Sequence, residues 1–241
     1  MSVAKEQREK LIWEFPNIGK KAPEQEEKAF AYCEGYKEFL NVAKTEREFV
    51  REAVLRLKEA GYEEFEEGKI YQPGDKVYQI NRKKALLMST FGKRPLEDGV
   101  RINVAHIDSP RLDLKPNPLY EKAEAAYFKT HYYGGIRKYQ WATIPLAMHG
   151  VVILKDGTSM DICIGEKKGD PVFCVTDLLP HLAAQQNERK LKDGIKGEEL
   201  NIIVGSLPYP CEEEDSIKEP VKLLALSILN ERFGMTEKDF L

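Results

Sequence analysis

The sequence has few cysteines, and they lie far apart. Its 241 residues include four of them, and no two form a Cys-x-x-Cys pair: they are Cys33, Cys163, Cys174 and Cys211. A structural zinc site built from thiolates needs at least one close pair, so this class of site is not expected. Four reduced thiols are typical of a cytoplasmic protein, which is the localisation that we predict.

Long apolar segments and an excess of basic residues are also missing. No run of about 18 apolar residues occurs, so we expect no membrane-spanning helix. The charged N-terminal stretch lacks the apolar core of a signal peptide. Lysine and arginine number 37 against 40 acidic residues, for a net charge of -3. A sequence-independent nucleic-acid binder needs a basic surplus. We therefore expect neither a membrane nor a nucleic acid as a partner.

Several enzyme motifs are absent as well. The sequence contains no Gly-x-Ser-x-Gly elbow, no P-loop and no Gly-x-Gly-x-x-Gly fingerprint. Acyl-serine, nucleotide and dinucleotide chemistry therefore find no support. What remains is the composition of a folded protein, with 42% hydrophobic and 32% charged residues. The chain is long enough for one large or two small domains.

The first part of the chain has the patterns of two helices. Helix-forming residues, with apolar side chains at helical spacing, fill residues 23–43. Thr45 and Glu48 then form a capping box, because each side chain can bond a backbone amide left open at a helix start. The helix that they open is expected to end at Gly61.

Strand patterns follow these helices. Residues 77–81 and 85–91 read as two strands joined by a tight turn. Residues 100–104 alternate between apolar and polar side chains, which predicts a third strand with one strongly apolar face. Helices followed by strands with crossovers indicate an α/β core.

Residues 117–208 have a different texture. They are rich in β-branched and aromatic residues, and Asp156-Gly157 is a hairpin signal between two strand patterns. One helical stretch is predicted at residues 176–187. A β-rich module inserted between helical segments is the natural interpretation.

The last predicted element is a helix. The acidic run before it, residues 211–215, reads as a solvated linker. Ser216 and Glu219 offer a second capping box, and an apolar stripe follows that ends near Gly234. The stripe consists of Val221, Leu224, Ala225, Ile228 and Leu229.

His106 and Asp108 are the sharpest candidates for chemistry. They lie two residues apart at the end of the apolar strand predicted at 100–104, so both side chains should point to one side. An imidazole can ligate a divalent metal, and a nearby carboxylate can orient it. The alternative is an ordinary histidine beside a turn-forming Asp-Ser-Pro, because His-x-Asp is common by accident.

The other three histidines have weaker signals. His131 lies in a polar and aromatic loop with two glycines, which could approach a ligand closely or form a simple turn. His149 lies in an apolar strand pattern and is interpreted as a packed core residue. His181 follows Pro180 at an expected helix start, where it could serve a subunit interface or cap the helix.

Three segments of the sequence, taken together, are specific. They are VAHIDSPRL at 104–112, YFKTHYYGGIRKYQW at 127–141 and DLLPHL at 177–182. They strongly resemble the aspartyl aminopeptidase and vacuolar aminopeptidase I family (metallopeptidase family 18), in its bacterial branch. The resemblance continues through the last helix to Phe240 and so covers nearly the whole chain.

The resemblance implies a zinc-dependent exopeptidase that removes N-terminal residues from peptides. Its fold would be α/β, with a zinc-exopeptidase-like catalytic domain, incomplete here, interrupted by a β-rich dimerisation domain. The implied division is 1–116 for the first catalytic segment, 117–208 for the dimerisation domain and 209–241 for a return helix. Peptide substrates and further copies of the chain, as a homodimer or larger homo-oligomer, would be its partners.

The resemblance also assigns roles to single residues. His106 matches the first zinc ligand of the family, and Asp108 matches the acid that orients this histidine. A complete active site would hold two zinc ions, or other divalent metals. Some eukaryotic-type members lend a histidine from the dimerisation domain to the partner subunit's active site, and the aligned residue here is Gln185. His131 and His181 remain candidates for substrate contact or an interface.

The sequence departs from the family in length. Family members continue well beyond the position of Leu241, and the bridging aspartate, the catalytic glutamate and the remaining ligands lie in that part. One histidine and one aspartate cannot hold a two-zinc site. We therefore expect an N-terminal portion of an aminopeptidase that is inactive alone. The alternative is a non-catalytic truncated or split product that retains only self-association.

Overall fold

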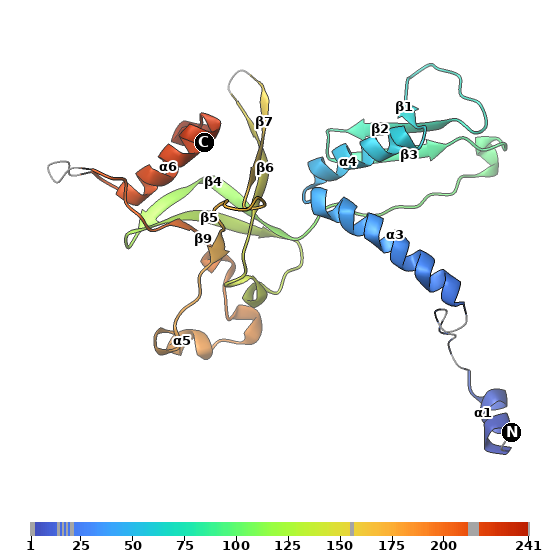
Figure 1. Cartoon of the computed structure of the whole chain (residues 1–241), viewed down its shortest axis with the longest axis horizontal. Coiled ribbons are helices and arrows are strands. Elements are labelled where there is room, and N and C mark those ends of the chain that lie inside the picture. Colours follow the sequence, from blue (N-terminus) through green and yellow to red (C-terminus); the bar gives the residue numbers. More distant parts are fainter. Residues whose placement is uncertain are drawn as a thin grey trace. The chain divides into compact units, whose positions relative to one another are not determined.

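The computed structural model describes residues 3–13, 15, 17, 19, 22–154, 157–211 and 217–240 (Figure 1). The chain folds as two compact units, Met1–Ile107 and Asp108–Leu241, and each is described by itself. No described helix is both long enough and apolar enough to cross a membrane.

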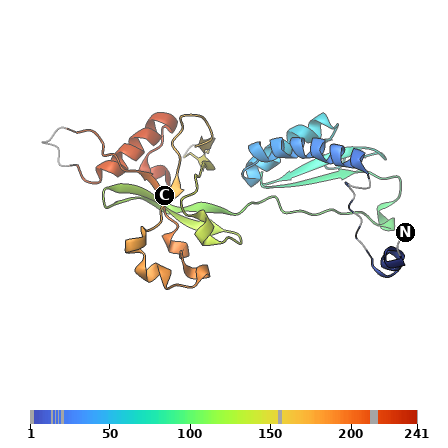
Figure 2. The ribbon, with the colours of Figure 1, turned by 60° about the horizontal axis from the view of Figure 1, so that its bottom comes forward.

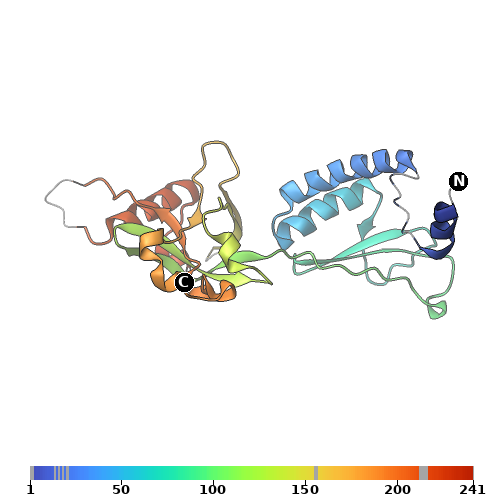
Figure 3. The ribbon, with the colours of Figure 1, turned by 90° about the horizontal axis from the view of Figure 1, so that it is seen from below.

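The first unit is a small sheet covered by helices. Its elements are α1 (Val3–Leu11), α3 (Pro23–Val42), α4 (Glu46–Glu59), β1 (Glu63–Glu64), β2 (Lys76–Asn81), β3 (Ala85–Thr90) and η1 (Leu96–Asp98). β1 runs parallel to β2, and β2 pairs antiparallel with β3. α4 packs on β2 and β3, α3 packs on α4, and Figure 3 shows both helices on one side of the sheet. Among the described residues of this unit, the buried apolar side chains are Val50, Val77 and Tyr78.

The predicted helices and hairpin of this unit are confirmed. At the start of α4, the Thr45 hydroxyl accepts a hydrogen bond from the Glu48 N–H at 3.3 Å, and the Glu48 carboxylate accepts one from the Thr45 N–H at 2.9 Å. This is the predicted capping box. The β2–β3 turn places Arg82 and Lys83 at φ 51° and 58°, because a turn of this hand matches the twist of the paired strands.

The predicted strand at residues 100–104 is wrong. Residues 99–110 form neither helix nor strand, and Val100, Ile102 and Val104 are 61%, 74% and 89% exposed. A strand forms only where a neighbour bonds its N–H and C=O groups. No described segment of the chain pairs with these residues, so the alternating pattern has no partner.

The second unit contains a four-stranded sheet and a separate hairpin. Its strands and α-helices are β4 (Arg111–Lys122), β5 (Ala125–Tyr133), β6 (Met148–Ile153), β7 (Ser159–Ile164), β8 (Cys174–Val175), α5 (Ala184–Asn187), β9 (Ile202–Gly205) and α6 (Pro220–Phe233). Its 3-10 turns are η2 (Lys138–Trp141), η3 (Pro180–Leu182), η4 (Leu191–Asp193), η5 (Gly197–Glu199) and η6 (Glu237–Phe240). The sheet is antiparallel, in the order β4-β5-β9-β8. β6 and β7 form the predicted hairpin; Asp156 of its turn lies outside the described residues.

The core of this unit lies between α6, the sheet and the β6–β7 hairpin. Phe128 of β5, Val175 of β8 and Leu200 are almost completely buried, and Val221 and Leu229 of α6 join them. α6 packs on β4, β5 and β9, and Figure 2 shows this helix above the strands. All five residues of the predicted apolar stripe of α6 line one cavity between the helix and the sheet, and Ile228 is 43% exposed. The predicted end of the helix at Gly234, which has φ 66°, is confirmed.

The start of α6 differs from the prediction. Ser216 lies outside the described residues, and Glu219 is the residue that precedes the helix, so the helix begins later than the predicted capping box requires. The acceptor at this helix start comes from a distant strand: the Glu121 carboxylate accepts hydrogen bonds from the N–H groups of Val221 and Lys222, both at 2.9 Å. This contact fixes α6 to the end of β4.

The helix predicted at residues 176–187 is only partly present. Residues 176–179 are not helical, and the rest forms the short elements η3 and α5. Pro180 explains the late start, because the residue before a proline is driven to an extended conformation. Leu179 accordingly has φ -65° and ψ 149°.

The two compact units do not coincide with the predicted three-part division. The predicted boundary at 116/117 lies inside β4, where the β4–β5 register shifts between Leu114 and Leu119 and Asn117 has φ 49°. A bulge of this kind bends a strand. The division into 1–116, 117–208 and 209–241 remains a prediction.

Candidate metal centre

The segment without regular structure, residues 99–110, carries both sharp candidates. His106 is exposed and belongs to the first compact unit, whereas Asp108 is half-buried and belongs to the second. The expected end of a sheet strand is therefore not what positions them, because residues 100–104 form no strand. Each residue is described within its own unit.

Asp108 is held by the end of strand β5. The Tyr133 hydroxyl donates a hydrogen bond to the Asp108 carboxylate at 2.8 Å. Tyr133 pairs directly with Arg111 across the β4–β5 ladder, and the Arg111 guanidinium lies 4.1 Å from the centre of the Tyr133 ring. Cross-strand neighbours are close enough for such a cation–π contact. Tyr133 thus orients the carboxylate, and Arg111 orients Tyr133.

Arg111 also ties down the chain that leads away from Asp108. Its Nε donates to the Asp113 carboxylate at 2.8 Å, and its Nη1 donates to the Ser109 carbonyl at 3.4 Å. The start of β4 is therefore fixed on both sides of Arg111. Sequence reasoning missed this network, although Tyr133 and Arg111 both lie in the segments that carry the family resemblance.

His131 lies on strand β5 rather than in the predicted loop. Its ring stacks on Tyr132, with ring centres 5.4 Å apart, and it pairs with Asp113 across the ladder. The pKa of the nearby Glu198 carboxyl is lowered, first by a 2.6 Å hydrogen bond from Lys115 and by the charge of Lys115. The charge of His131 contributes to the same effect. His131 is exposed.

His181 lies in the exposed turn η3. Its neighbours Leu178, Leu179 and Leu182 are 54%, 60% and 64% exposed. The turn therefore presents leucine side chains to solvent around the histidine. Exposed apolar groups that lie close together are typical of interaction surfaces.

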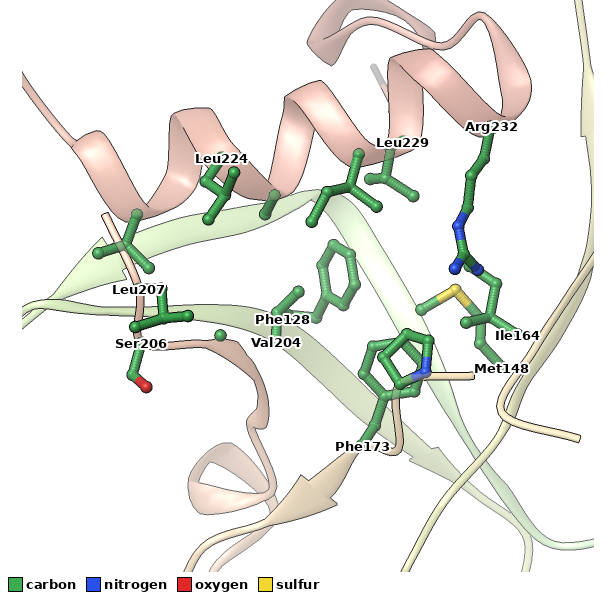
Figure 4. Close-up of a pocket in the computed structure, with 15 residues that line it drawn as sticks. Phe128, Met148, Ile164, Phe173, Val204, Ser206, Leu207, Leu224, Leu229 and Arg232 are labelled. Atoms are coloured by element: carbon green, nitrogen blue, oxygen red, sulfur yellow. The ribbon is translucent and has the colours of Figure 1, made fainter. Parts of the chain in front are cut away.

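A cavity of about 350 Å³ lies under α6, and none of the predicted site residues lines it. Figure 4 shows Leu224 and Leu229 of α6 above Phe128 and Val204 of the sheet, with Arg232 at one end. Arg232 is its one charged lining residue in the described chain. Such a lining offers packing for apolar groups but neither a general base nor metal ligands.

The donor set suits zinc in kind but not in number. Imidazole and carboxylate groups are ordinary zinc ligands, and a site needs three or four of them. Among the described residues, no group of three or more His, Cys, Asp or Glu side chains could hold a metal ion. His106 and Asp108 supply two at most, so the described residues do not fit a complete zinc site.

Comparisons with known proteins place the chain in a family. Residues 39–241 match the family described as aminopeptidase I zinc metalloprotease (M18). A probable M18 family aminopeptidase 1 of Clostridium acetobutylicum is 48% identical over 235 residues, which cover 95% of this chain and 50% of the relative. A crystal structure of an M18 aminopeptidase from Thermotoga maritima is similar with a TM-score of 0.83 and 44% identity, over 95% of this chain and 49% of that one. The mApe1 dodecamer of S. cerevisiae, 19% identical over 86% of this chain and 46% of that one, shares the fold with a TM-score of 0.58.

These matches confirm the resemblance carried by the three sequence segments and the α/β fold class. The chain spans about half the length of the curated relatives it matches. The matched residues include His106, Asp108 and the residues that hold Asp108. The chain belongs to the aminopeptidase I zinc metalloprotease family.

Proposed function

We propose that this chain is the first half of a zinc-dependent aminopeptidase, a cytoplasmic hydrolase that removes N-terminal residues from peptides. The observation that carries the proposal is the family match over residues 39–241. It is supported by 48% identity over 235 residues to a probable aminopeptidase. The identity is high enough for single residues to be compared between the two chains.

In this proposal His106 is a metal ligand and Asp108 is the residue that orients it. A carboxylate can fix the ring of a ligating histidine only if the carboxylate is itself held in place. The 2.8 Å hydrogen bond from Tyr133 supplies that support, and the Arg111 guanidinium over its ring stabilises Tyr133 in turn. His131 and His181 are proposed for substrate or interface contacts.

We propose that the chain alone does not hydrolyse peptides. The absence of any group of three metal-ligating side chains among the described residues supports this. The same observation favours a second candidate function, a non-catalytic product that retains only self-association. The exposed leucines around His181 would then serve an interface between copies of the chain, and the dodecameric yeast relative supports assembly in the family.

A fusion protein tests the catalytic proposal. In this fusion, the chain replaces the segment of the Clostridium acetobutylicum relative that it matches, and this segment is 50% of that protein. We expect the fusion to hydrolyse amino-acid nitroanilides and to lose this activity with a chelator. His106→Ala should abolish turnover, and Asp108→Asn should lower it about 10–100-fold, as for other residues that orient a metal ligand.

Asp98→Asn is the matched control, because Asp98 is an exposed aspartate of the 3-10 turn η1. Its turnover should equal that of the unmodified fusion. A folded fusion that cleaves none of the amides, or one that stays fully active after His106→Ala, would contradict the proposal. A fusion that is inactive but dimeric in sedimentation would favour the self-association function instead.

A further inference from the structure

The two faces of the β6–β7 hairpin differ in chemistry. Along both strands, alternate side chains belong to the hydrophobic core; they are Met148, Val152, Met160, Ile162 and Ile164. The remaining positions face the other way, because side chains alternate across a strand. Cys163 and His149 lie on this outer face, and Cys163 is an exposed thiol.

Cys163 and His149 are direct neighbours across the hairpin. The ladder pairs His149 with Cys163. Residues directly opposite in an antiparallel pair have Cβ atoms about 4.5–5.5 Å apart, and their side chains lie on the same face. The thiol and the imidazole can therefore approach each other on this face of the hairpin, which proton transfer between them requires.

A third residue fixes the histidine ring. His149 Nε2 lies 2.9 Å from a carboxylate oxygen of Glu166, and the His149 side chain is only 13% exposed. With Nε2–H donating to this carboxylate, Nδ1 is the ring nitrogen that can accept a proton. His149 was interpreted as a core residue from the sequence; in the structure it is half-buried and engaged in a polar contact.

The turn after β7 holds Glu166 in position. Gly165 has φ 106°, and a Cβ at this position would lie 3.0 Å from the Ala147 Cα. The Asp170 carboxylate accepts hydrogen bonds from the N–H groups of Gly165 and Lys167, at 3.1 and 3.2 Å. The backbone on both sides of Glu166 is therefore anchored, which places its carboxylate within reach of His149.

A nucleophile, a neighbouring base and a third group that orients the base form the arrangement that activates a cysteine. We propose that Cys163, His149 and Glu166 form a thiol modification site that reacts with low-molecular-weight disulfides. His149 takes the proton of the Cys163 thiol. The thiolate then attacks one sulfur of the disulfide: a bond forms between Cys163 Sγ and that sulfur, the disulfide bond of the reagent breaks, and the other half leaves as a thiolate.

The other cysteines have different surroundings. Cys33 is exposed on α3, with Phe30 and Tyr36 one helical turn away. Cys211 is exposed, and Cys174 is half-buried on β8, where it pairs with Ile203. Cys33 and Cys211 thus serve as internal reference thiols for Cys163.

The test measures the reaction of each cysteine in the native chain. The chain is mixed with dithiobis(nitrobenzoate) near neutral pH, and the labelled peptides are quantified over time by mass spectrometry. An ordinary thiol is only a few per cent thiolate under these conditions, so activation should make Cys163 react at least about tenfold faster than Cys33 and Cys211. In concentrated urea the rates should become equal.

Two variants identify the roles of the partners. His149→Gln and Glu166→Gln should both slow Cys163 towards the rate of Cys33 and leave Cys33 itself unchanged. The pH at which the Cys163 rate reaches half its plateau should rise in both variants. Asp161, the other ionisable side chain on this face of β7, is unchanged in both. Circular dichroism verifies that each variant is folded.

Equal rates for Cys163 and the reference thiols in the native chain would overturn the proposal, whatever the variants show. A fast Cys163 whose rate survives both substitutions would overturn it as well. If His149→Gln does not fold, Glu166→Gln decides, because it leaves the half-buried imidazole ring in place and removes only the charge of its partner.

Discussion

Replacing Glu121 with alanine tests the contact that fixes helix α6 on the sheet. The Glu121 carboxylate accepts hydrogen bonds from the N–H groups of Val221 and Lys222, both at 2.9 Å and partly buried. A helix start carries unpaired N–H groups and a partial positive charge, so an anion is favourable there. A lost hydrogen bond to a charged group costs about 1.5–3 kcal/mol, and a lost helix cap costs about 0.5–2 kcal/mol. Because these effects overlap, we expect about 2 kcal/mol in total.

The loss translates into a shift of the melting temperature. The second unit has roughly 130 residues, and an unfolding entropy of about 2.1 cal/mol/K per residue then gives a fall in Tm of about 7 °C. Trp141 packs against the core of this unit, and Trp13 is the other tryptophan of the sequence. In a Trp13→Phe background, Trp141 fluorescence therefore follows the unfolding of this unit.

Two further substitutions complete the experiment. Glu121→Gln keeps an acceptor but removes the charge, so it should produce about half the shift of Glu121→Ala. Glu124→Gln is the matched control in the β4–β5 turn, where the side chain is exposed, and it should change stability by less than about 0.5 kcal/mol. The reasoning is refuted if Glu121→Ala and Glu124→Gln melt at the same temperature.

Two other substitutions and one hydrogen-exchange measurement have defined outcomes. Hydrogen bonds from the Gly165 and Lys167 N–H groups, with Arg232 nearby, hold the pKa of Asp170 below its usual range. The ionised Asp170 carboxylate therefore stabilises the fold above the ordinary carboxyl pKa of about 3.9, and this stabilisation is lost as the pH falls through the lowered pKa. Asp170→Asn should accordingly lower the Tm at neutral pH and have little effect in strong acid. Equal effects at both pH values would contradict this. Gly165→Ala should lower the urea midpoint by more than Gly157→Ala does. Both glycines have positive φ, but of the two only Gly165 would bring an added Cβ against backbone, 3.0 Å from the Ala147 Cα. Equal midpoints for the two variants would contradict this and would mean that the turn adapts. Hydrogen exchange should be fast at residues 99–106 and slow in β5 and α6, and protection of residues 99–106 would show that they have found a strand partner.

Local patterns in the sequence predicted the local structure well. The Thr45–Glu48 capping box, the β6–β7 hairpin and the apolar stripe of α6 depend on residues a few positions apart, and all three are present. The family resemblance was equally accessible, because it rests on contiguous segments. Each of these features depends on residues that lie close together in the sequence.

Long-range contacts could not be predicted in the same way. The acceptor at the start of α6 comes from Glu121, a hundred residues earlier in the chain, and nothing in either segment specifies the other. The partner of Asp108 is Tyr133, which the β4–β5 register brings to it. Residues 100–104 show the converse failure, since their alternating pattern predicts a strand but supplies no neighbour to pair with.

Zinc binding by the chain alone tests most directly whether it supplies only part of a metal site. The purified chain is dialysed against micromolar zinc, its metal content is measured, and hydrolysis of amino-acid nitroanilides is followed with and without a chelator. Because no described group of three side chains could hold a metal ion, we predict that the chain retains no stoichiometric zinc and shows no chelator-sensitive turnover. One tightly held zinc per chain, with turnover that both the chelator and His106→Ala abolish, would contradict this account.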